Sequence, residues 1–501
     1  MNKQIRIGIV ILVIALMLGL GIMIGNAESL ATKTNRADTG EYDLRFGVIS
    51  DTHVNSNLNH NPYPTVRRFE KVLDWYNTEE VDTLVIVGDI TERGRQSDWD
   101  TFKNAWENHK GRLQLIAVMG NHEVIEGNIN AAADRFERAT GQKTNAHYVI
   151  SGYHFIVLSG GEGDFTDQGA AGGAIATGRT AMPGHVHTGD NVSPSVKTWL
   201  RTRIDMAKAE APNKPIFVFL HWPIRNTTYR SEPSHTSSFG SDPLTGFFRD
   251  DPEVVFFSGH VHIPNNDPRS IWQGGFTAVN TATLYYLTME DGYLGNNANG
   301  TANINQPKIA GLSGRSLGTG QGMIVSVKGS RVIIENYDFD FSEGPRPLDS
   351  VVQIPQTWEF DVSRPEDFLY TKAKRDSQKT APMFDETKPT NASLDSIMIK
   401  RITDTAVEVE FPQARIPSPN PGNEVVHSYR FDFINQQTGV IDRSARQWSD
   451  FMLTPRLRKP TYIQLIGGLK PGTNYELHIY AYGSFQECSS QYLTCTLKTV
   501  N

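Results

Sequence analysis

The chain has 501 residues, a formal net charge of −7 and the composition of an ordinary globular protein. A chain of this length exceeds one compact core, so we expect two or more domains. The sequence has no cluster of lysine and arginine residues of the kind that binds a nucleic-acid backbone, so no binding to DNA or RNA polymers is expected.

The N-terminus predicts an export signal or a membrane anchor. Lys3 and Arg6 precede an uncharged apolar run at 7–25, which is long enough to span a bilayer. Small residues just before Glu28 have the spacing of a cleavage site, so 1–27 is either a cleaved signal peptide or a retained anchor. In both cases the rest of the chain is expected outside, secreted or membrane-anchored, because the positive charges stay inside.

Beyond a linker at 28–43, short apolar runs alternate with amphipathic segments. Five runs rich in Val, Ile and Phe suit strands that are buried on both faces. They are LRFGVIS, DTLVIVG, LQLIAVMG, PIFVFL and EVVFFSG, and they are followed directly by Asp51, Asp89, Asn121, His221 and His260. Helical patterns at 65–79 and 96–109 separate the first three runs, and hairpins are predicted about 151–152 and about Gly329. The pattern indicates an α/β core with antiparallel additions.

Three later stretches lack periodicity. The segments 160–191 and 292–322 are rich in glycine, and loops of this length are usually functional lids or disordered insertions. A connector rich in proline and charge is predicted at 342–390.

The remaining segment, 391–501, predicts an all-β domain. Its strands alternate apolar and polar residues, and Tyr475 follows a Pro-Gly turn as in the tyrosine corner of β-sandwiches. The segment resembles a fibronectin type III module, with Phe411 where that family commonly has tryptophan. Three roles are open for this segment: it binds a surface glycan, it binds a partner protein, or it serves only as a spacer. Cys488 and Cys495 are either bridged locally or two unpaired core residues.

The polar residues at the strand ends predict a metal site. Ligands gather outside the carboxyl ends of strands in open α/β sheets, so the loops that follow the five runs should converge. One such residue has an ordinary explanation as a cap or a hydrogen-bonding group, but five in succession are hard to dismiss. Imidazole and oxygen donors without cysteine suit Mn, Fe, Zn or Ni better than calcium or a thiolate zinc site.

The motifs resemble the metallophosphoesterase, or calcineurin-like phosphoesterase, family. They are DTH at 51–53, GDITERG at 88–94, GNHE at 120–123, His221 and GHVH at 259–262. The resemblance covers 44–341 and implies a four-layer αββα sandwich that holds two metal ions. In motif pattern it is closest to the class III cyclic nucleotide phosphodiesterase branch. Purple acid phosphatases place a tyrosine shortly after the GD aspartate, and this chain has none there.

The resemblance also implies a ligand set and a mechanism. The first metal would take Asp51, His53 and His262, the second Asn121, His221 and His260, and Asp89 would bridge them. A hydroxide held between the ions would attack phosphorus. His122 would protonate or stabilise the leaving group, or alternatively orient a neighbouring ligand.

A second GHVH occurs at 184–187, inside the first glycine-rich stretch. No apolar strand precedes it, so His185 and His187 are interpreted as bystanders; the alternative is a lid that folds over the site and contacts substrate.

These observations predict an exported, dimetal-dependent hydrolase of phosphate esters, with diesters slightly favoured over monoesters by the resemblance alone. The alternative is a catalytically idle surface adhesin on the same fold. A complete donor set argues for the enzyme.

Overall fold

The computed structural model describes most of the chain, apart from several segments. The described residues are 41–57, 65–126, 129–159, 194–231, 243–287, 319–341, 351–384, 397–452 and 458–501. The apolar run at 7–25, the stretch 160–191 with its His185 and His187, and most of 292–322 therefore lie outside them. Within the described ranges, no helix combines the length and apolar character needed to cross a membrane.

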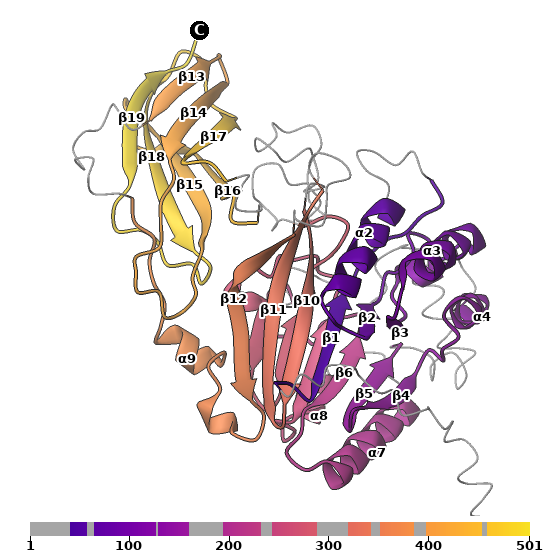
Figure 1. Ribbon diagram of the computed structural model, residues 1–501. Helices are drawn as coiled ribbons and strands as arrows, with labels where there is room; N and C mark the ends of the chain where they lie inside the picture. The colour runs from indigo at the N-terminus through magenta and orange to yellow at the C-terminus, as the bar shows by residue number, and fades with distance from the viewer. Residues whose placement is uncertain are drawn as a thin grey trace, which may run out of the picture.

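The first large sheet contains three of the five predicted strands (Figure 1). Its order is β12-β11-β10-β1-β2-β3, in which β1, β2 and β3 run parallel and β10, β11 and β12 are antiparallel additions. The bounds are β1 Leu44–Ile49, β2 Thr83–Val87, β3 Gln114–Val118, β10 Thr319–Lys328, β11 Arg331–Asp340 and β12 Val351–Asp361. Three helices pack on its outer face: α2 Thr65–Thr78, α3 Gln96–His109 and α4 Ile129–Thr140.

The second large sheet contains the other two predicted strands. Its order is β4-β5-β6-β7-β9-β8, with β5, β6, β7 and β9 parallel. The bounds are β4 Ala146–Ile150, β5 Tyr153–Leu158, β6 Ile216–Leu220, β7 Val254–Ser258, β8 Ile271–Gln273 and β9 Thr277–Asn280. Helix α7, Pro194–Glu210, packs on its outer face, and the short α8, Pro243–Phe247, lies nearby.

The two sheets face each other across an apolar layer. Phe46 of β1 contacts Phe155 of β5 and Phe217 of β6 edge to face, with ring centroids 4.9 and 5.0 Å apart. Every residue of β2, β6 and β7 is buried, because each strand has a sheet on one side and helices on the other. The four-layer αββα sandwich that was expected for this region is therefore confirmed. The hairpins at 151–152 and Gly329 are present too.

The segment 342–390 differs from the featureless connector that we expected. Residues Val351–Asp361 form β12, which pairs with β11 as the edge strand of the first sheet. Pro355 interrupts the run, and a register shift falls opposite it between Glu335 and Tyr337, so alternation in the sequence is broken. An edge strand tolerates proline because one side of it needs no partner. The following helix α9, Lys372–Asp376, leads towards the C-terminal domain.

The C-terminal domain is a two-sheet sandwich of the fibronectin type III kind. Its sheets have the orders β13-β14-β17 and β16-β15-β18-β19. The bounds are β13 Met398–Ile402, β14 Ala406–Pro412, β15 Val426–Asn435, β16 Ile441–Trp448, β17 Thr461–Gly467, β18 Asn474–Gly483 and β19 Leu493–Lys498.

Three details of this sandwich settle points raised by its sequence. The hydroxyl of Tyr475 accepts a hydrogen bond from the backbone N–H of Lys470 at 3.1 Å, which is the contact of a tyrosine corner. Phe411 is fully buried, so it takes the core position in which fibronectin type III domains commonly have tryptophan. Cys488 is exposed and Cys495 is buried, and both are free thiols rather than a bridge.

Candidate metal centre

The predicted ligands all follow strands whose carboxyl ends meet at one edge of the sandwich. Five of the seven adopt left-handed backbone conformations, which turn the chain sharply as each strand ends. They are Asp51 (φ 50°), His53 (φ 44°), Asp89 (φ 46°), His260 (φ 70°) and His262 (φ 53°). This conformation costs a non-glycine residue roughly 1–2 kcal/mol. Strain gathered at one place is typical of a functional site.

Glycines let these loops approach each other closely. A Cβ atom on Gly259 would lie 2.4 Å from Asp51 Oδ2, and one on Gly120 would lie 2.3 Å from Asp89 Oδ1. Gly88, with φ of +81°, has no room for a side chain because the ring of His221 would be 2.3 Å away. The glycines of the motifs are therefore required by the packing of the site itself.

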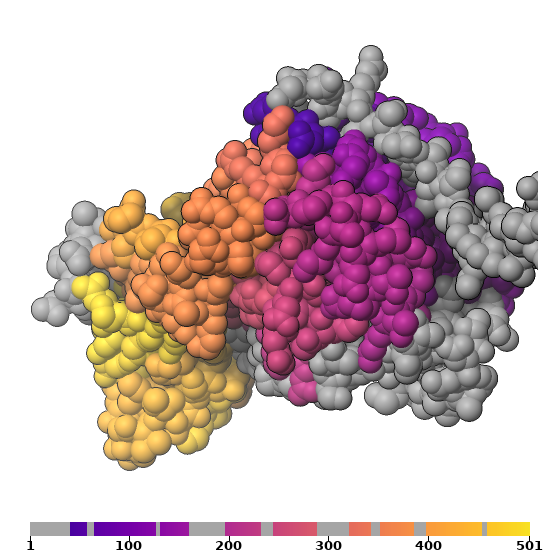
Figure 2. All heavy atoms as spheres, turned by 90° about the horizontal axis from the view of Figure 1, so that it is seen from below, coloured from indigo at the N-terminus to yellow at the C-terminus, as the bar shows by residue number. Residues whose placement is uncertain are grey.

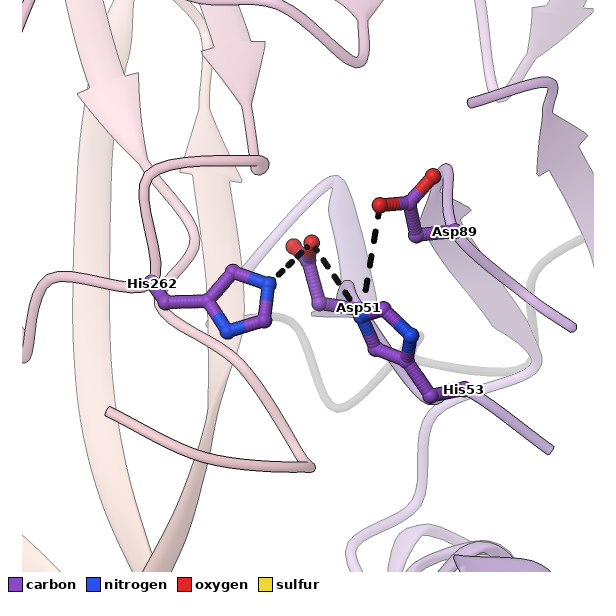
Figure 3. Close-up of side chains that lie close together, drawn as sticks. All are labelled: Asp51, His53, Asp89 and His262. Carbon is purple, nitrogen blue, oxygen red and sulfur yellow. Dashed lines mark ion pairs between the residues drawn. The ribbon is translucent and has the colours of Figure 1, made fainter. Parts of the chain in front are cut away.

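One group of donors joins Asp51, His53, Asp89 and His262 (Figure 3). All four are buried, and their donor atoms lie within 4.8 Å of one another. His262 Nε2 is 2.9 Å from Asp51 Oδ1, and His53 Nε2 is 3.9 Å from both Asp51 Oδ1 and Asp89 Oδ2. The predicted first-metal residues are thus brought together beside Asp89.

A second group joins Asp89, His221 and His260. His221 Nε2 lies 3.2 Å from Asp89 Oδ2, and the rings of His221 and His260 are 5.1 Å apart. Asn121 is buried. It lies next to this group, because the backbone N–H of the next residue, His122, donates to Asp89 Oδ1 at 2.8 Å. Asp89 belongs to both groups.

The tautomers of three histidines follow from their partners. His221 Nδ1 donates to the carbonyl of Val87 at 2.8 Å, and His262 Nδ1 donates to the carbonyl of Tyr286 at 2.7 Å. His53 Nδ1 donates to the carboxylate of Glu92 at 3.0 Å. These oxygens can only accept, so Nδ1 carries the proton in each neutral ring. The lone pair then resides on Nε2, which faces the carboxylates of Asp51 and Asp89.

Several buried atoms of the site make no hydrogen bond to the part of the chain that the structure describes. They are His53 Nε2, His221 Nε2 and Asn121 Oδ1. Buried polar atoms normally have partners, and a lone pair aimed at a carboxylate is repelled by it. Cations between these atoms would satisfy all of them, so the residues fit a pair of metal ions.

The comparison with protein families decides the identity of this region. Residues 44–264 match the family model described as calcineurin-like phosphoesterase. This region belongs to the calcineurin-like phosphoesterase family. The family implies a dinuclear metal site and a phosphate-ester substrate, and the geometry agrees with the first of these.

Solved structures with similar regions include two that each cover 64% of this chain. A purple acid phosphatase from yellow lupin (Lupinus luteus) seeds is 12% identical, with 64% of this chain and 53% of that chain covered and a TM-score of 0.36. This chain therefore spans about half the length of that phosphatase. A Vps29 single mutant from Entamoeba histolytica is 12% identical, with coverage of 64% and 100% and a TM-score of 0.26.

A third similar structure is the FN5 domain of Drosophila Lar. It is 14% identical, with 22% of this chain and 95% of that chain covered and a TM-score of 0.15. No curated protein matches this chain in sequence.

His122 borders the first metal group of the phosphoesterase domain. Its ring is 4.4 Å from that of His53, its Nδ1 donates to the carbonyl of Glu92 at 2.6 Å, and its Nε2 is 3.9 Å from Asp89 Oδ2. The side chain is 21% exposed, whereas those of His53 and His221 are 1% and 0% exposed. His122 is therefore the more accessible to a substrate.

Three further residues support the site, and the sequence reasoning gave them no role. Glu92 orients His53. Buried Glu123 accepts hydrogen bonds from the N–H groups of Thr91 and Gly120, at 2.9 and 2.7 Å, and so ties the Asp89 loop to the Asn121 loop. Tyr286 holds His262 through its carbonyl and packs its ring 4.3 Å from the histidine ring. The glutamates lie inside the GDITERG and GNHE motifs, which was a usable signal, whereas nothing in the sequence marks Tyr286.

The electrostatics of the site favour cations. Burial raises the pKa of the Asp89 carboxyl, but His221, His122 and His53 together lower it further, so this pKa lies well below its usual range. Burial lowers the pKa of His221, while Asp89 and Asp51 raise it, to about 9. The carboxylate thus stays ionised, and the proton held by His221 is one that a bound cation would displace.

Proposed function

We propose that this chain is an exported, dimetal-dependent hydrolase of phosphate esters. One observation carries the proposal: the Nδ1 atoms of His53, His221 and His262 are held by acceptors outside the cluster, which directs each Nε2 atom at Asp51 or Asp89. Such an arrangement needs positive charge at its centre. The apolar run at 7–25 and the basic residues before it support export.

Asp89 is suited to join the two metal sites. Its Oδ2 faces His53 of the first group at 3.9 Å and His221 of the second group at 3.2 Å. Its Oδ1 accepts the N–H of His122, which holds the carboxylate in place. When bound, the two cations would supply an activated water as nucleophile and positive charge for the phosphoryl group.

His122 is proposed to assist the leaving group. The carbonyl of Glu92 fixes its Nδ1 proton and leaves Nε2 beside the cluster, on a side chain that solvent reaches. An imidazolium there can give its Nε2 proton to the departing alkoxide, an effect typically worth about 10²–10⁴-fold in rate. The alternative role, orienting a ligand, belongs to the backbone of His122, whose N–H donates to Asp89 Oδ1, whereas the hydrogen bond given for its side chain goes to the carbonyl of Glu92.

The rival function is a surface adhesin with an idle phosphoesterase fold. It is tested by adding Mn²⁺ to protein from about residue 38 onward, with aryl phosphate monoesters and diesters as substrates. The proposal expects metal-dependent turnover of at least one class, and the ratio of rates separates phosphodiesterase from phosphatase. Absence of turnover of both classes, with every donor in place, would favour the adhesin.

The Asp89→Asn variant tests the shared ligand. An amide offers one oxygen and no charge, so we expect activity and both metal ions to be lost together. Asp74→Asn is the matched control, because Asp74 is 47% exposed and forms a surface ion pair with His109. Elemental analysis gives the readout, and full occupancy by two ions in Asp89→Asn would refute the ligand assignment.

A further inference from the structure

Two loops of the phosphoesterase domain carry three of the predicted ligands. One follows β6, begins at His221 and is described to residue 231, and the other follows β7 and carries His260 and His262. At their base the N–H of Gly259 donates to the carbonyl of His221 at 2.9 Å. The two loops are therefore joined near the site by a backbone hydrogen bond.

The far ends of the same loops are joined again. The N–H of Tyr229 donates to the carbonyl of Arg269 at 3.0 Å, and the Arg269 guanidinium lies 3.3 Å from the centroid of the Tyr229 ring. Arg269 also forms two hydrogen bonds to Asp267, at 2.9 and 2.7 Å. A buried charge needs such pairing, and the pairing keeps this joint rigid.

The C-terminal domain covers this joint. His427 of β15 is fully buried, with its ring 6.1 Å from that of Tyr229 and its Nε2 3.9 Å from Asp267 Oδ2. Behind His427 lie the rings of Trp448 and Phe451, at 5.7 and 5.4 Å. The apolar core is continuous across the contact, from Trp222, Ile224 and Tyr229 to Tyr429 and Trp448.

A side chain from the segment between the domains adds a second attachment. Arg375 of α9 donates a hydrogen bond to the carbonyl of Pro268 and lies 5.2 Å from the ring of Phe485 in the C-terminal domain. Figure 2 shows this segment, in orange, beside the C-terminal domain at one end of the molecule. The two domains resist separation, because parting them would expose a continuous apolar core together with the buried His427 and Asp267.

From these contacts we infer that the C-terminal domain is a fixed part of the metal centre's support. It holds the two histidine-bearing loops in the geometry that binds the ions, through His427 against Tyr229 and Asp267. Tyr229 and His427 are thus positioning residues, which act through His221, His260 and His262. The inference rests on the proposed function only in taking these histidines as metal ligands.

Variants of the full chain test the inference. We expect His427→Ala and Tyr229→Ala to bind Co²⁺ about tenfold more weakly, at the low end for groups that orient ligands, with an altered visible absorption spectrum. Tyr229→Phe keeps the ring under Arg269 and should restore both readings. His478→Ala is the control, because His478 stacks on Tyr492 in the same domain, 4.2 Å from that ring, and should bind as the parent does.

The outcomes separate this inference from the proposed function. Unchanged Co²⁺ affinity and spectrum in His427→Ala and Tyr229→Ala, even with lower thermal stability, would overturn the positioning role. If the two alanine variants do not fold, Arg375→Ala replaces them, because it removes the second attachment between the domains. Its Co²⁺ affinity and spectrum are then expected to change in the same direction. A parent protein that binds no Co²⁺ would instead refute the metal centre, while one joint unfolding transition of both domains would still support fixed docking.

Discussion

At the scale of residues, the site depends on which nitrogen of each histidine carries a proton. The carbonyl oxygens of Val87 and Tyr286 accept hydrogen bonds from the Nδ1–H groups of His221 and His262. The carboxylate of Glu92 accepts one from the Nδ1–H of His53. The Nδ1 protons are held by atoms outside the cluster, so Nε2 is the nitrogen that each ring presents to the site before any ion binds. This preorganisation reduces the reorganisation that metal binding requires.

Glu92 offers a direct test of this preorganisation. We expect Glu92→Ala to weaken metal binding about 10–100-fold, because His53 loses the carboxylate that accepts its Nδ1–H. Glu92→Gln should lose less, since its amide oxygen still accepts. Isothermal titration with Zn²⁺ measures both, and Glu126→Ala, which removes a glutamate paired with Arg93 and Arg95, is the control. Binding by Glu92→Ala equal to the parent's would show that His53 needs no such orientation.

The identities of the predicted ligands could be read from the sequence, but their supporting partners could not. Each ligand stands directly after an apolar run, and the ends of parallel strands share one edge. By contrast, Tyr286 meets His262 through a carbonyl whose direction depends on the loop after β9. No local pattern encodes such a contact. The structure brings the seven predicted ligands together, and their binding of metal stays a prediction.

At the scale of elements, each strand delivers its ligand through a sharp turn with a glycine beside it. The left-handed residues turn the side chains inward, and Gly259 and Gly120 let the neighbouring loops touch Asp51 and Asp89. Apolar runs predicted these strands well because they are buried on both faces. The edge strand β12 was missed, because Pro355 and a register shift interrupt its alternation.

A single methyl group tests this packing. In Gly259→Ala the new Cβ would lie 2.4 Å from Asp51 Oδ2 and 2.7 Å from Ser50 Oγ, so Asp51 must move. We expect activity to fall about 100-fold, the scale of a 1 Å misplacement. Gly467→Ala is the matched control, because nothing lies within 4 Å of its Cβ. Steady-state kinetics on an aryl phosphate decides, and parent-like activity in Gly259→Ala would contradict the observed closeness of the loops.

At the scale of the whole molecule, the two domains share one buried junction with several ionisable groups. The separate domain classes were readable from the sequence, because each has its own periodicity. Their docking was not, since His427, Asp267 and Arg375 come from segments far apart and look unremarkable singly. The domain boundaries at 341 and 390 stay predictions, although β12 shows that the first sheet continues beyond residue 341.

Glu424 at this junction predicts a pH dependence of stability. Burial, then Glu487 and Asp267, raise its pKa to about 8, so the folded protein favours the protonated carboxyl. This contribution to the free energy of unfolding is fully present below the usual glutamate pKa and is lost as pH rises through about 8. We expect Glu424→Gln, which mimics the protonated form, to unfold at higher urea concentration than the parent above pH 8 and to differ little at pH 4.

The matched control for that series is Glu408→Gln, on the partly exposed face of β14. It should not reproduce the gain seen above pH 8. If the urea midpoint of the parent at pH 9 is as high as that of Glu424→Gln, ionisation of Glu424 does not lower the free energy of unfolding. The prediction is then wrong.

Anomalous X-ray diffraction from crystals loaded with Mn²⁺ tests the central claim most directly. The account predicts two peaks about 3.5–4 Å apart, one beside His262 Nε2 and one beside His221 Nε2, with Asp89 between them. A single peak, or two peaks remote from Asp89, would contradict it.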